Sequence, residues 1–467
     1  MNTMTMNPCA NLVRKGGVGR GETPFRGGQA PASGRERLAR KFLLALGLSV
    51  AALAAEAGIH IEHWQAPSGA RVYFVESRTL PIIDVQVDFP AGAAADPADT
   101  AGLAQLTRDL MDLGAGGMDE NEVATKLADI GARLSGGADS DRASVGLRTL
   151  AEPKKRDAAF AILRAVLAEP RFDARVFERE RARTVAALSE SLTRPDTIAS
   201  RAFWSALYGN HPYGQLTTVE SLGRIGVGDL AAFHAARYTA RSAVVTIVGD
   251  LDRAGAEALA EQLTGALPAG EAPAPLPVAA LPPAGDVRLP HPAAQAHIRL
   301  GLPALKRGDP DFHALTVGNY SLGGGGFVSR LVKEVRDKRG FAYSVYSYFA
   351  PMRERGPFQI GLQTRREQAG EALDVARDEL LRFLAEGPSE DELAAAKANL
   401  IGSFPLRLDS NRKILDNVAA IAFYGLPLDY LDTYAEKIRQ VTVADVRAAF
   451  ARHVRPENLV TVVVAGD

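Results

Sequence analysis

Two stretches of this chain share the same succession of elements, and this repeat constrains the fold more than any other feature. Residues 229–250 read DLAAFHAARYTARSAVVTIVGD, and residues 445–467 read DVRAAFARHVRPENLVTVVVAGD. Each stretch predicts a helix with an inward-facing aromatic residue, a polar turn and a β-branched strand suited to burial in a sheet. A chance match between two common helix–strand patterns is the alternative. The repeat predicts two similar structural units.

A connector separates the two units. Residues 268–290 are rich in Pro and Ala and predict an extended segment, so we expect an N-terminal domain over residues 58–267 and a C-terminal domain over residues 291–467. Strand patterns open both units and helical patterns follow, over residues 71–92, 100–131 and 155–209 in the first and 296–305, 311–339 and 366–425 in the second. Strands and helices grouped in blocks predict an α+β fold of two similar lobes, each a mostly antiparallel β-sheet backed by helices.

Composition excludes several classes of function. The 467 residues are 46% hydrophobic and 23% charged, which is typical of a globular protein. The formal net charge of −1 provides no basis for binding nucleic acid or acidic lipid. The single cysteine, Cys9, precedes the predicted domains, so the folded part has neither a disulfide nor a thiolate metal site.

The first 57 residues predict a leader with a signal peptide. Basic residues from Arg35 to Lys41 precede an apolar run of 14 residues, Phe42 to Ala55, and small residues follow it. The run is too short to span a bilayer comfortably, so we expect no stable membrane insertion. We therefore expect export, to the periplasm or otherwise out of the cytoplasm. An uncleaved anchor and a buried N-terminal helix are the alternatives.

The segment GLAQLTRDLMDLGAGG (102–117) resembles the signature of the pitrilysin/insulinase metallopeptidase family. In that signature a Gly-Leu-Ala-like lead precedes the inverted zinc motif His-x-x-Glu-His. Positions i and i+4 of a helix share a face, so two His can bind one Zn²⁺ while the Glu activates water. The corresponding positions here hold Gln105, Arg108 and Asp109. The resemblance covers about residues 65–467 and implies that the two lobes form half of a clamshell.

The substitutions remove the chemistry of that motif. Gln105 is a weak neutral donor, Arg108 is a cation that repels Zn²⁺, and we expect Asp109 to pair with Arg108. The resemblance places the third ligand at Ala186 or Ala187, which cannot bind metal. We therefore expect no metal and no catalytic group in this chain. The alternative is that a generic helix has been matched to the motif.

A second motif supports the resemblance. The segment ALYGNHPYGQLTTVESLGRI (206–225) resembles a stretch that the family carries after the third-ligand helix, with His211, Pro212, Tyr213 and Gly214 in sequence. His211 is more often structural than a ligand in such a string.

The C-terminal unit resembles the substrate-binding part of the family. In SLGGGGFVSRLVKEVRDKRGFAYSVYSYF (321–349), an Arg precedes a Tyr by seven positions, at Arg336 and Tyr343. The resemblance implies that this pair holds the substrate backbone and helps to stabilise the tetrahedral intermediate, since both side chains are donors. The alternative is that Arg336 pairs with a local acid and Tyr343 packs on the sheet.

Four glycines precede this pair and predict a flexible turn that permits close approach of another backbone. The run resembles the glycine-rich loop of the non-catalytic subunit of mitochondrial processing peptidase. The resemblance therefore implies a role in substrate binding for the glycines, which are Gly323, Gly324, Gly325 and Gly326.

A degenerate zinc site in a chain that keeps the Arg/Tyr pair suggests that substrate binding and zinc chemistry belong to two different subunits. We expect the chain to pair with a zinc-bearing homologue that has an intact His-x-x-Glu-His motif, so that zinc belongs to the partner. Short or unfolded peptides are the expected substrates. Two alternatives stay open: a cell-envelope protein that binds peptides or aids assembly without hydrolysis, and an independent metallopeptidase with unusual ligands.

Overall fold

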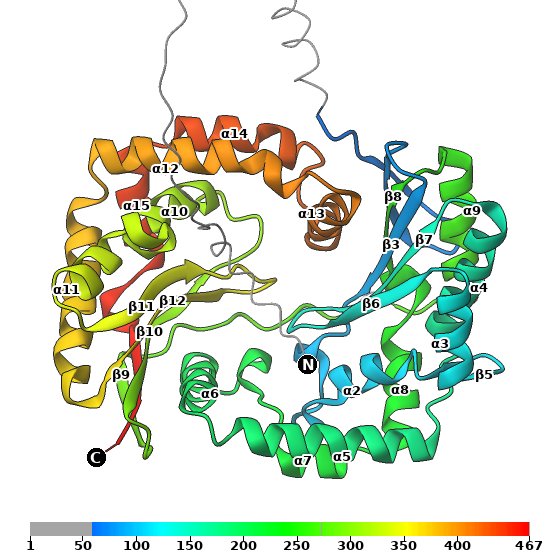
Figure 1. The fold of residues 1–467 in the computed structure, drawn as a ribbon, viewed down its shortest axis with the longest axis horizontal. Coiled ribbons are helices and arrows are strands. Elements are labelled where there is room, and N and C mark those ends of the chain that lie inside the picture. The colour runs from blue at the N-terminus through cyan, green and yellow to red at the C-terminus, as the bar shows by residue number, and fades with distance from the viewer. Residues whose placement is uncertain (1–57, 272, 467) are drawn as a thin grey trace, which may run out of the picture. The chain divides into compact units, whose positions relative to one another are not determined.

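The computed structural model describes residues 58–271 and 273–466 (Figure 1). The predicted leader and signal peptide, residues 1–57, lie outside this range, so export stays a prediction. Contacts place the chain from His60 onward in one unit. Among the helices of the described residues, none is both long enough and apolar enough to cross a membrane.

The first sheet belongs to the N-terminal lobe and has six strands in the order β1-β2-β8-β3-β7-β6. Neighbouring strands pair antiparallel except β2 and β8, which run parallel. Strand β8 reads VVTIVG and is buried along its whole length, because helices cover both faces of the sheet. The strands are β1 (Glu62–Gln65), β2 (Arg71–Glu76), β3 (Ile82–Phe89), β6 (Arg133–Ala138), β7 (Ala143–Leu150) and β8 (Val244–Gly249).

Helices pack on one face of this sheet and enclose an apolar core. In Figure 1, α3, α4 and α9 lie along that face. Phe74, Val87 and Leu163 are fully buried in the core. The helices are α2 (Leu103–Leu110), α3 (Glu120–Asp129), α4 (Pro153–Ala168), α5 (Ala174–Ser191), α7 (Val219–Arg224), α8 (Val227–Arg237) and α9 (Arg253–Thr264), and a short hairpin of β4 (Gly114–Ala115) and β5 (Met118–Asp119) joins α2 to α3.

The second sheet belongs to the C-terminal lobe and has five strands in the order β11-β12-β10-β13-β9. Strands β13 and β9 run parallel, and the other pairs are antiparallel. The strands are β9 (Gly285–Pro290), β10 (Gln295–Leu305), β11 (Ala342–Phe349), β12 (Gly356–Arg365) and β13 (Val460–Ala465). The helices that back the sheet are α10 (Phe312–Asn319), α11 (Ala369–Glu386), α12 (Glu390–Ser403), α14 (Tyr430–Gln440) and α15 (Val443–His453).

The predicted repeat occupies the same place in both lobes. Helix α8 leads into β8, and helix α15 leads into β13. Each of these strands lies between an antiparallel neighbour, β3 or β10, and a parallel neighbour, β2 or β9. The prediction of two similar lobes, each a mostly antiparallel sheet backed by helices, is confirmed. Strand β9 forms the end of the segment predicted as a connector.

Each half of the sequence contributes one helix to the lobe of the other half. Helix α6 (Pro195–Tyr208) packs on β10 and β13 of the second sheet, and Phe203 and Val462 belong to the same buried cluster. Helix α13 (Asn411–Tyr424) packs on β3 and β8 of the first sheet. The sequence pattern identifies both segments as helical, but it does not predict this exchange.

Helix α13 explains why the polar face of strand β3 is buried. The sequence of β3 alternates as predicted, yet Asp84, Gln86 and Asp88 on its polar face are each at most 6% exposed. Arg148 donates to Asp84 through two hydrogen bonds of 2.8 and 2.9 Å. Burial raises the pKa of Asp88, although Arg142, 3.4 Å away, opposes the shift. Alternation therefore marks the two faces of the strand correctly, but a second layer of helix covers the polar one.

The Asp141 carboxylate, buried in the β6–β7 loop, joins the two halves. It accepts hydrogen bonds from the phenols of Tyr213 and Tyr424 and from the backbone N–H of Arg353. Burial and the Asp141 charge raise the pKa of both phenols, so both remain protonated donors. Tyr213 belongs to the His-Pro-Tyr-Gly string, in which the His211 ring accepts from the Tyr213 N–H at 3.1 Å. This string therefore has a structural role here.

Replacing Asp141 tests that role. Asp141→Ala removes the shared acceptor of three donors, and each donor left without a partner costs about 1 kcal/mol or more, so we expect the free energy of unfolding to fall by at least about 3 kcal/mol. Tyr213→Phe removes two hydrogen bonds, the one donated to Asp141 and the one accepted from the backbone N–H of Glu354, and should cost about 1–3 kcal/mol. Urea-induced unfolding measures both changes. Asp378→Ala, at an exposed aspartate, is the matched control. Equal unfolding midpoints for Asp141→Ala and this control would contradict the role.

Candidate functional site

Helix α2 carries the first three positions at which the resemblance places zinc chemistry. It begins after Gly102, whose φ of 105° is in the left-handed region. The Asp96 carboxylate accepts from the N–H groups of Gly102 and Ala104, at 2.7 Å each, and so satisfies donors at the start of the helix. Burial raises the pKa of Asp96 to about 6. The start of α2 is therefore fixed by an acceptor from the preceding loop.

Arg108 points into the protein rather than toward solvent. Its side chain is 4% exposed, and its guanidinium donates to the backbone oxygens of Ser144 at 2.5 Å and Ser135 at 2.7 Å. Its ion-pair partner is Asp112, one helical turn further on, at 3.6 Å. Gly136 makes room for it, because a Cβ at that position would lie 2.8 Å from Nη2 of Arg108. The cation therefore ties α2 to strands β6 and β7.

Gln105 and Asp109 lie together on the exposed side of α2. Nε2 of Gln105 donates to Oδ1 of Asp109 at 2.8 Å. The expectation that Asp109 pairs with Arg108 is wrong. The two residues are adjacent in sequence, so their side chains leave the helix in different directions, and Arg108 turns inward to Asp112.

The residues at these positions do not fit a zinc ion. A zinc site needs three or four imidazole, thiolate or carboxylate ligands. Here the amide and the carboxylate bind each other, and the third residue is a buried cation. Ala186 and Ala187 lie on α5 and offer no donor atom. Within residues 58–271 and 273–466, the one set of three possible ligands close together lies in the other lobe.

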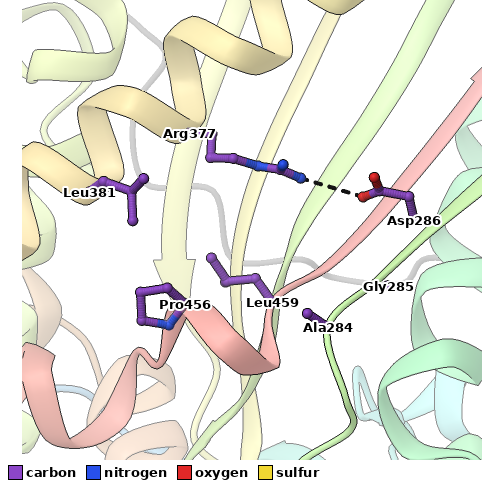
Figure 2. A pocket seen from close by; sticks show the side chains of 7 residues that line it. All are labelled: Ala284, Gly285, Asp286, Arg377, Leu381, Pro456 and Leu459. Carbon is purple, nitrogen blue, oxygen red and sulfur yellow. Dashed lines mark hydrogen bonds and ion pairs between the residues drawn. The ribbon is translucent and has the colours of Figure 1, made fainter.

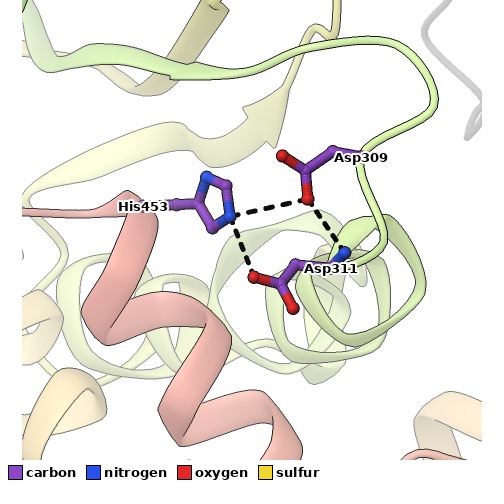
Figure 3. Close-up of side chains that lie close together, drawn as sticks. All are labelled: Asp309, Asp311 and His453. Atoms are coloured by element: carbon purple, nitrogen blue, oxygen red, sulfur yellow. Dashed lines mark hydrogen bonds and ion pairs between the residues drawn. The ribbon is translucent and has the colours of Figure 1, made fainter.

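That set is Asp309, Asp311 and His453 (Figure 3). Nε2 of His453 lies 3.0 Å from Asp311 and 3.7 Å from Asp309, and its Nδ1 lies 3.1 Å from the backbone oxygen of Ala304. Arg452 donates to both oxygens of Asp311, at 2.7 Å each, and these bonds lower the pKa of that carboxyl. The arginine already neutralises Asp311, so this cluster is an ion-pair network that anchors the end of α15. The sequence contains no signal for it beyond the position of His453 in the repeat.

Arg336 and Tyr343 are brought together by the structure. Arg336 lies on a π-helical turn, Val332–Asp337, and Tyr343 lies on β11, with a tight turn at Gly340 (φ 63°) between them. Cζ of Arg336 lies 4.8 Å from the ring centroid of Tyr343 and 4.8 Å from that of Phe327. Tyr343 is 85% exposed, so it does not pack on the sheet. The sequence spacing predicts this pair but not Phe327.

The neighbouring arginines differ from Arg336 because acids already bind them. Arg330 donates to Glu392 at 2.7 Å, and Arg339 donates to Glu334 at 2.8 Å. The guanidinium of Arg336 makes no hydrogen bond or ion pair with any residue in the described part of the chain. Its N–H donors are therefore free to bind a ligand.

The four glycines before the pair lie in helical turns rather than in an open, flexible turn. Gly323 and Gly324 close a π-helical segment, Tyr320–Gly324, and Gly326 (φ 62°) begins a 3₁₀ turn, Gly326–Val328. A Cβ at Gly323 would lie 2.6 Å from the backbone nitrogen of Ser347 on β11, and one at Gly325 would lie 2.6 Å from the backbone oxygen of Tyr320. The backbone that Gly323 approaches belongs to this chain, so the run positions the turn that carries Phe327.

A cavity of about 290 Å³ lies beside β9 and α11, and none of these residues lines it (Figure 2). Its lining cation, Arg377, pairs with Asp286 at 3.4 Å and donates to Thr461 at 2.8 Å. The cation is thus engaged within the protein. The lining residues are Ala284, Gly285, Asp286, Arg377, Leu381, Pro456 and Leu459.

The fold and these sites define a two-lobed, peptidase-like protein whose metal positions do not fit zinc. Two family models match its sequence: Insulinase (Peptidase family M16) over residues 71–219, and Peptidase M16 inactive domain over residues 224–400. The crystal structure of a peptidase M16 inactive domain from Pseudomonas fluorescens is 37% identical, with a TM-score of 0.85 over 88% of this chain and 99% of that chain.

Some further relatives are named as proteases and one is named as a non-peptidase homologue. The non-peptidase homolog YmxG of Helicobacter pylori is 26% identical over 91% of this chain and 98% of its own length. The uncharacterized zinc protease SCO5738 of Streptomyces coelicolor is 31% identical over 54% of this chain, and the match spans only 57% of that protein. The periplasmic protease PqqL of Escherichia coli shares the fold, with 17% identity and a TM-score of 0.75 over 88% of this chain and 47% of PqqL. The chain belongs to the insulinase family, peptidase family M16, as an inactive homologue.

Arg108 provides a test of the altered helix. Arg108→Ala leaves the Ser135 and Ser144 oxygens without their donor, and we expect a loss of about 2–4 kcal/mol in the free energy of unfolding. Gln105→Ala, on the exposed side of the same helix, should change it by less than about 0.5 kcal/mol. Urea-induced unfolding of both variants makes the comparison. If Arg108→Ala were as stable as Gln105→Ala, Arg108 would not be a structural tie.

Proposed function

We propose that this chain is the non-catalytic subunit of a peptide-degrading heterodimer. Its partner is a zinc-bearing homologue with an intact His-x-x-Glu-His motif, which supplies the metal and the general base. This chain supplies Arg336 and Tyr343 and part of the enclosing chamber. The observation that carries the proposal is the unpaired guanidinium of Arg336, held between two exposed rings.

The proposed chemistry is donation to a peptide carbonyl. The carbonyl oxygen gains negative charge as water attacks its carbon, so a positioned guanidinium and a phenol bind the transition state more tightly than the substrate. Arg336 is well suited to this because its N–H donors have no partner in the described part of the chain. The substrates are short or unfolded peptides, because a closing chamber admits only flexible chains.

The proposed compartment is the periplasm or another site outside the cytoplasm. Residues 35–57 have the three-part pattern of a signal peptide. A structural relative, PqqL, is described as periplasmic. The net charge of −1 offers no case for nucleic acid as a partner.

Co-expression with the zinc-bearing homologue tests the proposal. We expect the heterodimer to cleave an unfolded peptide. Arg336→Ala should lower kcat/KM by roughly 10²–10³-fold, the range seen when one oxyanion donor is removed. Tyr343→Phe should lower it by about 10-fold or more, since it loses one donor and keeps the ring. The activity is measured with a quenched fluorescent peptide.

Arg339→Ala is the matched control, because Arg339 is a neighbouring arginine already paired with Glu334. It should leave kcat/KM within about two-fold of the unmodified complex, as a surface substitution does. Undiminished activity in both the Arg336 and Tyr343 variants would refute the proposed role. Peptide binding without cleavage by any heterodimer would instead favour a cell-envelope peptide-binding or assembly protein.

A further inference from the structure

Phe327 forms a platform with the Arg/Tyr pair. The three side chains come from separate segments: Phe327 from the 3₁₀ turn Gly326–Val328, Arg336 from the π-helical turn and Tyr343 from β11. Cζ of Arg336 lies 4.8 Å from the centroid of each ring. The cation is therefore flanked by two aromatic rings, an arrangement that holds a guanidinium in place.

The platform faces solvent. Phe327 is 70% exposed and its neighbour Val328 is 53% exposed. Keeping such apolar groups in water is unfavourable, and exposed apolar groups gathered around a binding group are typical of an interaction site. Ser329 closes the turn that carries Phe327, because its backbone N–H and its hydroxyl donate to the Gly326 oxygen at 3.0 and 2.7 Å. The turn that carries the ring is therefore formed before any ligand arrives, which lowers the entropy cost of binding.

The donor groups and the apolar surface of the platform indicate which kind of ligand it would bind. Arg336 offers unpaired N–H donors, which match a backbone carbonyl. The two rings and Val328 offer apolar surface beside those donors. A basic side chain would be repelled by the guanidinium. The complementary ligand is thus an extended peptide with an apolar or aromatic side chain next to the bound carbonyl.

We propose that Phe327 is a specificity-determining residue, which together with Arg336 and Tyr343 selects unfolded peptides with apolar side chains. This inference rests on the proposed peptide-binding role of Arg336 and Tyr343. Phe327 acts through contact with the peptide side chain and by holding Arg336 in place.

The test compares two labelled peptides that differ only at their central residues, Leu-Phe in one and Ser-Ser in the other. Their affinity for the full chain is measured by fluorescence anisotropy. We expect Phe327→Ala to weaken binding of the Leu-Phe peptide about 10-fold and to change binding of the Ser-Ser peptide by at most about three-fold. Phe327→Tyr keeps the ring and should retain the preference. Leu428→Ala, at another exposed apolar residue of the same lobe, should change neither affinity.

The outcomes separate this inference from the proposed function. If Arg336→Ala weakens binding of both peptides while Phe327→Ala changes neither, the specificity role of Phe327 is overturned and the proposed function stands. If Arg336→Ala has no effect on either affinity, both are overturned. If the unmodified chain binds neither peptide, the inference about Phe327 is overturned, and the cleavage assay on the heterodimer decides the proposed function. Equal losses for both peptides in Phe327→Ala would show a merely structural role for the ring and would also overturn the inference.

Discussion

The buried guanidinium of Arg108 is the constraint on which the N-terminal lobe depends. It donates to two backbone oxygens in strands β6 and β7 and pairs with Asp112, so the helix and the sheet are joined by a permanent charge. Arginine remains protonated at all physiological pH values. A permanent cation at this place serves the fold and opposes a divalent ion nearby. The poor fit of these positions for zinc is thus a consequence of how the helix packs.

Arg108 and Arg336 differ in what their guanidinium groups contact. Arg108 is buried and has partners for its donors, whereas Arg336 is flanked by exposed rings and has no partner in the described residues. The first arginine stabilises structure. The second keeps its donors available, which is the property that a ligand-binding group needs. The exchange of α6 and α13 and the buried Asp141 carboxylate then hold the two lobes together.

Much of the fold is predictable from the sequence because it depends on local patterns. The β-branched runs before Gly249 and Ala465 predict central strands, and their repetition predicts two lobes. The exchange of helices is not predictable, because periodicity shows which side of a helix is apolar but not which sheet it meets. The polar residues of β3 look solvent-facing for the same reason, since the helix that covers them is more than 300 residues away in sequence.

The candidate site likewise has features that the local sequence predicts and features that it does not. The seven-residue spacing of Arg336 and Tyr343 predicts a pair that the structure does bring together, because a short turn connects their segments. The contact of Phe327 with Arg336 and the pairing of Arg108 with Asp112 depend on side-chain direction, which spacing alone does not give.

The central claim is that this chain holds no catalytic zinc. Metal analysis of the purified chain, with a peptide cleavage assay on the same sample, tests it most directly. We predict far less than one zinc per chain and no cleavage without a partner; one zinc per chain together with cleavage would contradict the account.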